Sequence, residues 1–138
     1  MILLDTDMFT LLGHKHPKAT ARLAAATDVV AITIATRVEA LEGRIAFMMK
    51  AADGEQLLRA QQWLQRTEAD LARLPVVALD DAAAAEFDRL LGTKGLKKIG
   101  RGDLMIASIA LANKATLVTR NRKDFQKVPG LQTENWAD

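Results

Sequence analysis

Four carboxylates, far apart in the sequence, are the side chains best suited to chemistry. They are Asp5 at the end of an apolar N-terminal run, Glu39 and Asp103 near the starts of two expected helices, and Asp124 shortly after a second apolar run. Carboxylates packed together without cations repel and raise one another's pKa. A hard divalent cation with oxygen ligands removes that conflict, and Mg²⁺ or Mn²⁺ suits such a site. The four acids therefore predict a magnesium or manganese centre if the fold brings them together.

Each acid taken alone has a simpler structural interpretation. Asp5 and Asp124 are typical turn residues, Asp103 is a typical helix N-cap, and Glu39 could complete a capping box with Thr36. Only the convergence of all four favours a functional site, and convergence depends on the order of the strands.

Three polar residues stand beside the acids in the sequence. Asp7 is predicted to cap the helix that follows Asp5. Thr119 and Asn121 come directly after the apolar run Thr116–Val118, and we expect them to orient metal ligands from behind.

Basic residues flank two of the acids. Cations around a carboxylate cluster suit a polyanion whose phosphate is drawn to a metal, although each lysine taken alone is more typical of a solvated surface. The candidates for contacting such a polyanion are Lys97, Lys98, Arg101, Arg120, Arg122 and Lys123.

Other common chemistries find little support. His14 and His16 form an H-x-H pair, but no third nitrogen or sulfur ligand accompanies them, so a zinc site is not expected. We interpret both as exposed loop residues. The chain has no cysteine and no serine set beside a histidine, which argues against a nucleophilic triad.

The elements that must position the acids alternate between strands and helices. Predicted strands cover 1–5, 29–35, 76–79, 116–118 and 131–134, and predicted helices cover 17–27, 36–51, 55–74, 81–91 and 103–113, with a short helical turn at 9–12. The helices at 36–51 and 55–74 are expected to form a hairpin. This alternation predicts a mostly parallel sheet covered on both faces, whose strand exits share one edge. Asp5, Glu39, Asp103 and Asp124 would then meet at that edge.

Composition fits one ordinary domain spanning 1–138. Hydrophobic residues make up 49% of the chain and charged residues 26%, and the net charge is +2. The absence of cysteine excludes a disulfide framework, and no stretch resembles a signal peptide or a membrane span. We therefore expect a cytoplasmic protein without a membrane partner.

Five segments, in this order, resemble the PIN-domain ribonucleases. They are LLDTD, TRVEALEG, GDLMIASIAL, LVTRNRKDF and PGLQTENW. Together they cover essentially the whole chain, and the chain is similar to the small VapC-type toxins of type II toxin–antitoxin pairs.

The resemblance implies a PIN-like three-layer α/β/α sandwich with a mostly parallel sheet of four to five strands. It implies that Asp5, Glu39, Asp103 and Asp124 form the acidic quartet of a Mg²⁺- or Mn²⁺-dependent ribonuclease, with RNA as the polyanion. It also implies a homodimer and a small antitoxin partner that covers the acidic site.

Three alternatives remain at this stage. The chain could be a PIN-fold module that has lost catalysis and only binds RNA or an antitoxin. It could be a receiver-like phosphoacceptor domain, with Asp80 and Thr119 after strands, although no lysine–proline pair follows the last strand. Asp5 and Asp7 also suggest a haloacid dehalogenase type phosphatase, but Phe9 stands where that pattern needs threonine or valine.

Overall fold

The computed structural model describes residues 1–138, with five strands and seven helices. In chain order these are β1 (Ile2–Leu4), α1 (Thr6–Gly13), α2 (Pro17–Ala25), β2 (Val30–Thr33), α3 (Ile34–Met49), α4 (Gly54–Leu71), β3 (Val76–Val77), α5 (Asp81–Leu91), α6 (Arg101–Ala112), β4 (Thr116–Val118), α7 (Arg122–Phe125) and β5 (Gln132–Glu134). None of the helices combines the length and apolar character that crossing a membrane requires.

The five strands form one parallel sheet in the order β3-β2-β1-β4-β5. In the central strand, Leu3 lies opposite Ala31 on one side and Leu117 on the other. The short apolar runs form strands here because side chains on both faces of a parallel sheet are covered by helices. The predicted parallel α/β sheet is confirmed, and its strand order places the end of β1 between the ends of β2 and β4.

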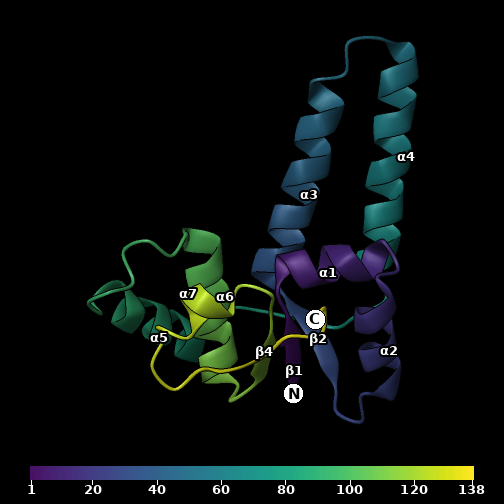
Figure 1. Ribbon diagram of the computed structural model, residues 1–138. Helices are drawn as coiled ribbons and strands as arrows, with labels where there is room; N and C mark the ends of the chain where they lie inside the picture. Colours follow the sequence, from purple (N-terminus) through teal and green to yellow (C-terminus); the bar gives the residue numbers. More distant parts are fainter.

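Alternating side chains along the strands divide the core between two helical layers. Leu4, Ile32 and Val118 are buried with residues of α1 and α2. Leu3, Ala31 and Leu117 are buried with residues of α5 and α6. Figure 1 shows these two pairs of helices on opposite sides of the sheet. The sandwich therefore has the three layers expected from the sequence, and burial of each large apolar side chain contributes roughly 1.5–3 kcal/mol.

Helices α3 and α4 form the expected hairpin, which projects well beyond the sheet (Figure 1). Only parts of it are buried: Ala35 and Thr36 in α3, and Ala60, Thr67 and Leu71 in α4. The base of the hairpin is thus anchored at the edge where β1 and β2 end, and its upper part extends into solvent.

Several element boundaries differ from the sequence expectations. Helix α1 spans two turns instead of a single turn at 9–12, and its N-cap is Asp5, so the predicted capping role of Asp7 is wrong. Helix α3 begins at Ile34 with Thr33 as its cap, because the Thr33 hydroxyl oxygen accepts from the backbone N–H of Thr36 at 3.2 Å. Glu39 therefore takes no part in a capping box.

Two further differences affect the second half of the chain. Helix α6 begins at Arg101, two residues earlier than expected, with Gly100 at the N-cap and no capping side chain. The segment around Asp124, expected to be a polar turn, is the one-turn helix α7. Both changes leave Asp103 and Asp124 in first helical turns.

Candidate active site

Asp5 is a buried carboxylate at the carboxyl end of the central strand. Its side chain is held from two directions: Oδ1 accepts from the backbone N–H of Met8 at 2.8 Å, and Oδ2 accepts from the Thr119 hydroxyl at 2.5 Å. The residue is only 5% exposed. Burial raises its pKa from 3.8 to about 6, although both hydrogen bonds act in the opposite direction. Asp5 is therefore fixed in place in an environment that disfavours its negative charge.

Thr119 links Asp5 to the segment that follows β4. Because β1 and β4 are neighbours, the residues that follow them lie side by side. The Thr119 hydroxyl donates to Asp5 and accepts from the backbone N–H of Asn121 at 2.9 Å. The Asn121 side-chain amide in turn donates to Asp124 Oδ2 at 3.1 Å. One chain of hydrogen bonds thus joins two of the acids through the two polar residues predicted to support them.

Glu39 reaches the same edge from the second turn of α3. Its Oε1 accepts from the Thr6 hydroxyl at 2.9 Å. The Thr6 oxygen also lies 3.0 Å from the Thr36 hydroxyl, which must donate because the Thr6 proton is used toward Glu39. Thr6 is a site residue that sequence reasoning missed, since a threonine in a first helical turn carries no distinctive pattern.

Gly102 allows Glu39 to approach the start of α6. A Cβ built on Gly102 would lie 2.9 Å from Cδ of Glu39, closer than real Cβ atoms approach. The absent side chain at Gly102 therefore leaves the space that the Glu39 carboxylate occupies. This contact brings Glu39 next to Asp103, the following residue of α6.

Asp103 is the electrostatic centre of the acids. Partial burial raises its pKa, and the negative charges of Glu39 and Asp124 raise it further. The charges of Asp7 and Asp103 likewise raise the pKa of Asp5. Asp7 itself is exposed in the first turn of α1. All four predicted acids thus lie at one sheet edge, close enough to repel one another.

No cation neutralises these carboxylates. The four ion pairs of the structure all lie elsewhere: Met1–Asp28, Arg22–Glu134, Arg59–Glu55 and Arg89–Glu86. The donor set is made of carboxylate oxygens, which are the ligands that Mg²⁺ and Mn²⁺ prefer. No three histidine, aspartate or glutamate side chains stand in the arrangement of a complete metal cage.

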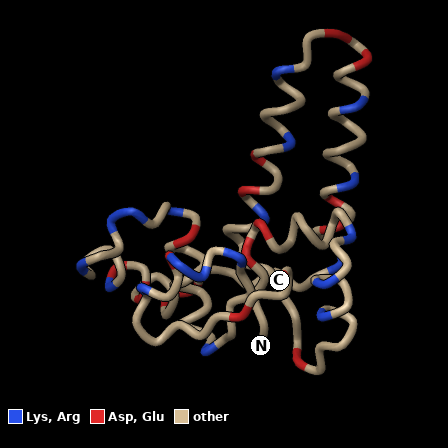
Figure 2. Tube along the Cα trace, viewed as in Figure 1, with Lys and Arg blue, Asp and Glu red and all other residues tan.

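The six predicted polyanion-binding cations lie in the loop before α6, at the start of α6, and in or just before α7. All are exposed: Lys97, Lys98, Arg101, Arg120, Arg122 and Lys123. Figure 2 shows basic segments in the loop before α6 and around α7, and acidic segments where the hairpin meets the sheet. The guanidinium of Arg101 lies 6.0 Å from the centre of the Phe87 ring and pairs with no acid.

Two other sequence candidates have local structural roles. His16 is the N-cap of α2, where its Nδ1 accepts from the backbone N–H of Ala19 at 3.3 Å, so it is not simply an exposed loop residue. Asp80 caps α5 by accepting from the backbone N–H of Ala83 at 2.9 Å. Asp80 follows the edge strand β3, two strands away from the Asp5 position, so the receiver-like pairing of Asp80 with Thr119 does not form.

The chain was compared with known proteins. The model of the PIN domain family matches residues 2–131. A Rickettsia felis protein named ribonuclease VapC2 is 31% identical and aligns over 97% of this chain and 96% of its own length. The tRNA(fMet)-specific endonuclease VapC of Shigella flexneri is 34% identical over 51% of this chain and 54% of its own.

Solved structures agree with the family assignment. VapBC2 from Rickettsia felis bound to a promoter DNA fragment contains a chain with 29% identity and a TM-score of 0.78, covering 99% of both chains. DNA-bound VapBC from Salmonella typhimurium gives 26% identity and a TM-score of 0.80, covering 98% of this chain and 97% of that one. This chain therefore belongs to the PIN-domain family and, within it, to the VapC-type proteins.

Proposed function

We propose that this protein is a metal-dependent endoribonuclease that acts as the toxin of a toxin–antitoxin pair. The observation that carries the proposal is the group of four unneutralised carboxylates, Asp103 among them, contributed by four separate segments of the chain. The relatives named ribonuclease or endonuclease support the same reaction class.

Asp5, Glu39, Asp103 and Asp124 would hold Mg²⁺ or Mn²⁺ at this edge. Such an ion lowers the pKa of water to a range accessible near neutral pH and stabilises negative charge on a phosphate oxygen. The chain's own contribution is positioning: Thr119 orients Asp5, Thr6 orients Glu39, and Asn121 orients Asp124. Because the oxygens are oriented in advance, less reorganisation accompanies the reaction.

RNA is the proposed substrate because exposed cations flank two of the four acids, Asp103 and Asp124, along the chain. Lys97, Lys98 and Arg101 precede Asp103, and Arg120, Arg122 and Lys123 surround α7. Cations on both sides of a carboxylate cluster attract a phosphate backbone that the carboxylates alone would repel.

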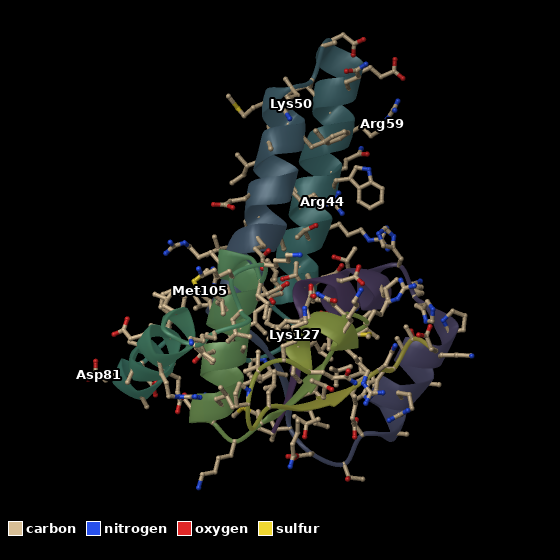
Figure 3. The ribbon with its side chains drawn as sticks, turned by 60° about the vertical axis from the view of Figure 1, so that its left-hand side comes forward. Arg44, Lys50, Arg59, Asp81, Met105 and Lys127 are labelled. Atoms are coloured by element: carbon tan, nitrogen blue, oxygen red, sulfur yellow. The ribbon has the colours of Figure 1, made fainter.

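Cleavage of an end-labelled single-stranded RNA with Mg²⁺ or Mn²⁺, and with EDTA as the metal-free control, tests this function. Asp103→Asn should abolish cleavage. Asp81→Asn is the matched control, because Asp81 is an exposed acid in the first turn of α5, away from the site (Figure 3). If Asp103→Asn cleaves as fast as the unmutated protein, the proposed site is wrong.

We also propose that a small antitoxin covers the hairpin and the acid edge. The structural neighbours are VapBC complexes, and one is described as a toxin–antitoxin complex from Klebsiella pneumoniae. The upper hairpin carries large exposed apolar side chains: Phe47 is 50% exposed, Met49 81% and Leu58 63%. Apolar side chains gathered in this way are typical of protein-binding surfaces.

Homodimerisation and a cytoplasmic location complete the proposal. Size-exclusion chromatography with light scattering measures the mass of the purified chain, and a monomeric mass at all concentrations contradicts the dimer.

The antitoxin proposal is tested by co-purification. If the hairpin holds the antitoxin, the product of a short neighbouring gene should co-purify with the unmutated protein and be lost with Met49→Asp. Retention of that partner by Met49→Asp would place its contact elsewhere.

A further inference from the structure

A pocket lined by several charged side chains adjoins the acid edge, and the basic loop before α6 lies on the other side of the sheet (Figure 1). Its cavity of about 310 Å³ lies between α1, α3 and α4, and Thr6 and Glu39 form the wall shared with the acid site. Trp63 of α4 forms another wall. The volume is at the lower end of the ~300–1,000 Å³ that small-molecule sites occupy.

Two arginines in this pocket are fixed against the same tryptophan. The guanidinium carbon of Arg44 lies 4.8 Å from the centre of a Trp63 ring, and that of Arg66 lies 5.5 Å from it. Each arginine also donates one hydrogen bond to an uncharged acceptor. Arg44 Nε donates to the Thr67 hydroxyl oxygen at 3.0 Å, and Arg66 donates to the Gly13 carbonyl oxygen at 3.0 Å.

Neither guanidinium forms an ion pair within 4.0 Å, although Glu39 and Asp70 line the same pocket. Both guanidinium carbons are so close to Trp63 that the two positive charges lie within about 10 Å of each other. Two positive charges at this separation repel each other, and an anion between or beside them relieves the repulsion. Each arginine also keeps further N–H donors, because a guanidinium has five.

We propose that this pocket binds the phosphate backbone of the RNA substrate next to the scissile bond, through Arg44 and Arg66. This inference rests on the proposed ribonuclease function. A phosphate matches the paired N–H donors of arginine better than it matches a lysine ammonium. The RNA strand would run from the basic loop before α6, across the acids, and into the hairpin base.

The acidic wall of the pocket agrees with RNA as its ligand. Glu39 belongs to the proposed cation site, where a divalent ion would offset its charge. The Asp70 carboxylate makes no hydrogen bond or ion pair within the chain, so it is free to accept from a ribose 2′-hydroxyl.

Fluorescence anisotropy of a labelled single-stranded RNA, measured with EDTA in an Asp103→Asn background, tests binding without cleavage. Arg44→Ala and Arg66→Ala should each weaken binding about 5- to 10-fold. Each should also reduce the slope of log affinity against log salt by roughly 0.7–1, the value for one lost phosphate contact. A merely structural role at Trp63 would leave that salt slope unchanged.

Matched variants separate charge from folding. Arg59→Ala removes one arginine charge from α4, the helix that carries Arg66, at a position nearer the hairpin tip (Figure 3). This variant should bind RNA as tightly as the Asp103→Asn background does. Arg44→Lys and Arg66→Lys should keep the salt slope and lose only part of the affinity, because the charge remains but the paired donors are lost. Thermal melts identify any alanine variant that fails to fold. In that case the RNA affinity and salt slope of the lysine variants test the proposal.

Failure of this inference differs from failure of the proposed function. If the unmutated chain cleaves RNA and the arginine variants bind with full affinity and slope, the pocket does not bind the backbone. If the variants keep RNA affinity and instead lose an antitoxin peptide, the pocket belongs to a protein partner and the inference is wrong. If the unmutated chain neither binds nor cleaves RNA, the proposed function itself is wrong.

Discussion

Gly102→Ala is expected to disable the site while leaving the fold intact. The new Cβ would lie 2.9 Å from Cδ of Glu39 and 3.0 Å from both of its carboxylate oxygens. Comfortable carbon contacts need about 3.5 Å, so the carboxyl group must move by roughly 0.5 Å or more, away from the new Cβ. The three atoms nearest to the new Cβ all belong to the flexible Glu39 side chain, which can make this movement.

The two consequences of the substitution have different sizes. Alanine is favoured over glycine within a helix by roughly 0.5–1 kcal/mol, so the free energy of unfolding should stay level or rise by up to that amount. A misplacement of about 1 Å at a reacting centre can lower the rate ~100-fold. We therefore expect kcat/KM for RNA cleavage to fall by roughly 10- to 100-fold.

Urea denaturation and a metal-dependent RNA cleavage assay measure the two effects separately. Gly100→Ala is the control, because a Cβ at this N-cap position meets nothing within 4 Å and lies only two residues away. Full cleavage activity in Gly102→Ala would refute the proposed contact between the Glu39 carboxylate and α6. Loss of the folded state would refute the claim that only a flexible side chain occupies that space.

Three further variants test the buried acid, its hydrogen-bond partner and the basic loop. Burial raises the pKa of Asp5 from 3.8 to about 6. Between these two pH values Asp5 is ionised in the unfolded chain but still protonated in the folded protein. The folded state therefore loses stability as the pH rises through this range, and the full loss is present only above pH 6. Asp5→Asn should thus raise the unfolding free energy of the metal-free protein by up to about 3 kcal/mol at neutral pH, and by little below the pKa of the unfolded chain. The same gain in unfolding free energy at both pH values would contradict this reasoning. Thr119→Val removes the donor to Asp5 and the acceptor for Asn121, so chemical denaturation should show a loss of about 1.5–3 kcal/mol; an unchanged midpoint would exclude the hydrogen-bond chain. Combined Lys97→Ala and Lys98→Ala should weaken RNA binding at low salt and flatten its salt dependence by roughly 1–2 in log–log slope, and a parallel salt dependence would remove the loop from the RNA path.

The sheet and the edge that carries the acids were predictable because local pattern and global fold agree there. Short apolar runs that end in polar residues produced β1, β2 and β4, and the parallel alternation then brings Asp5 and Thr119 to adjacent strand ends. Asp103 and Asp124 were placed at this edge for the same reason. The hairpin was also predictable, since an Asp53-Gly54 break separates two long helical patterns.

The contacts of Glu39 could not be predicted from local sequence. Thr33 and Thr36 are both reasonable N-caps, and a cap at Thr36 would assign Glu39 to a capping box. The actual donor to Glu39 is Thr6, which is 33 residues away, and the space it needs depends on Gly102. The local sequence alone does not distinguish a cap at Thr33 from a cap at Thr36, and the role of Glu39 is seen only in the folded chain.

The arginine pocket had no sequence signal for a similar reason. Its residues come from three helices, and Arg44 and Arg66 occupy positions that are ordinary for exposed helical faces. Only the packing of the hairpin base against α1 places both guanidinium groups on Trp63.

The central claim is that the four acids act as one metal-dependent site, and a double-mutant cycle of RNA cleavage tests it most directly. The measurement compares Asp103→Asn, Asp124→Asn and the double variant in saturating Mg²⁺ or Mn²⁺. If the acids act as a unit, each single variant loses roughly 100-fold or more in rate and the double variant is hardly slower than the worse single. Independent, multiplicative losses, or a single variant that keeps its full rate, would contradict the claim.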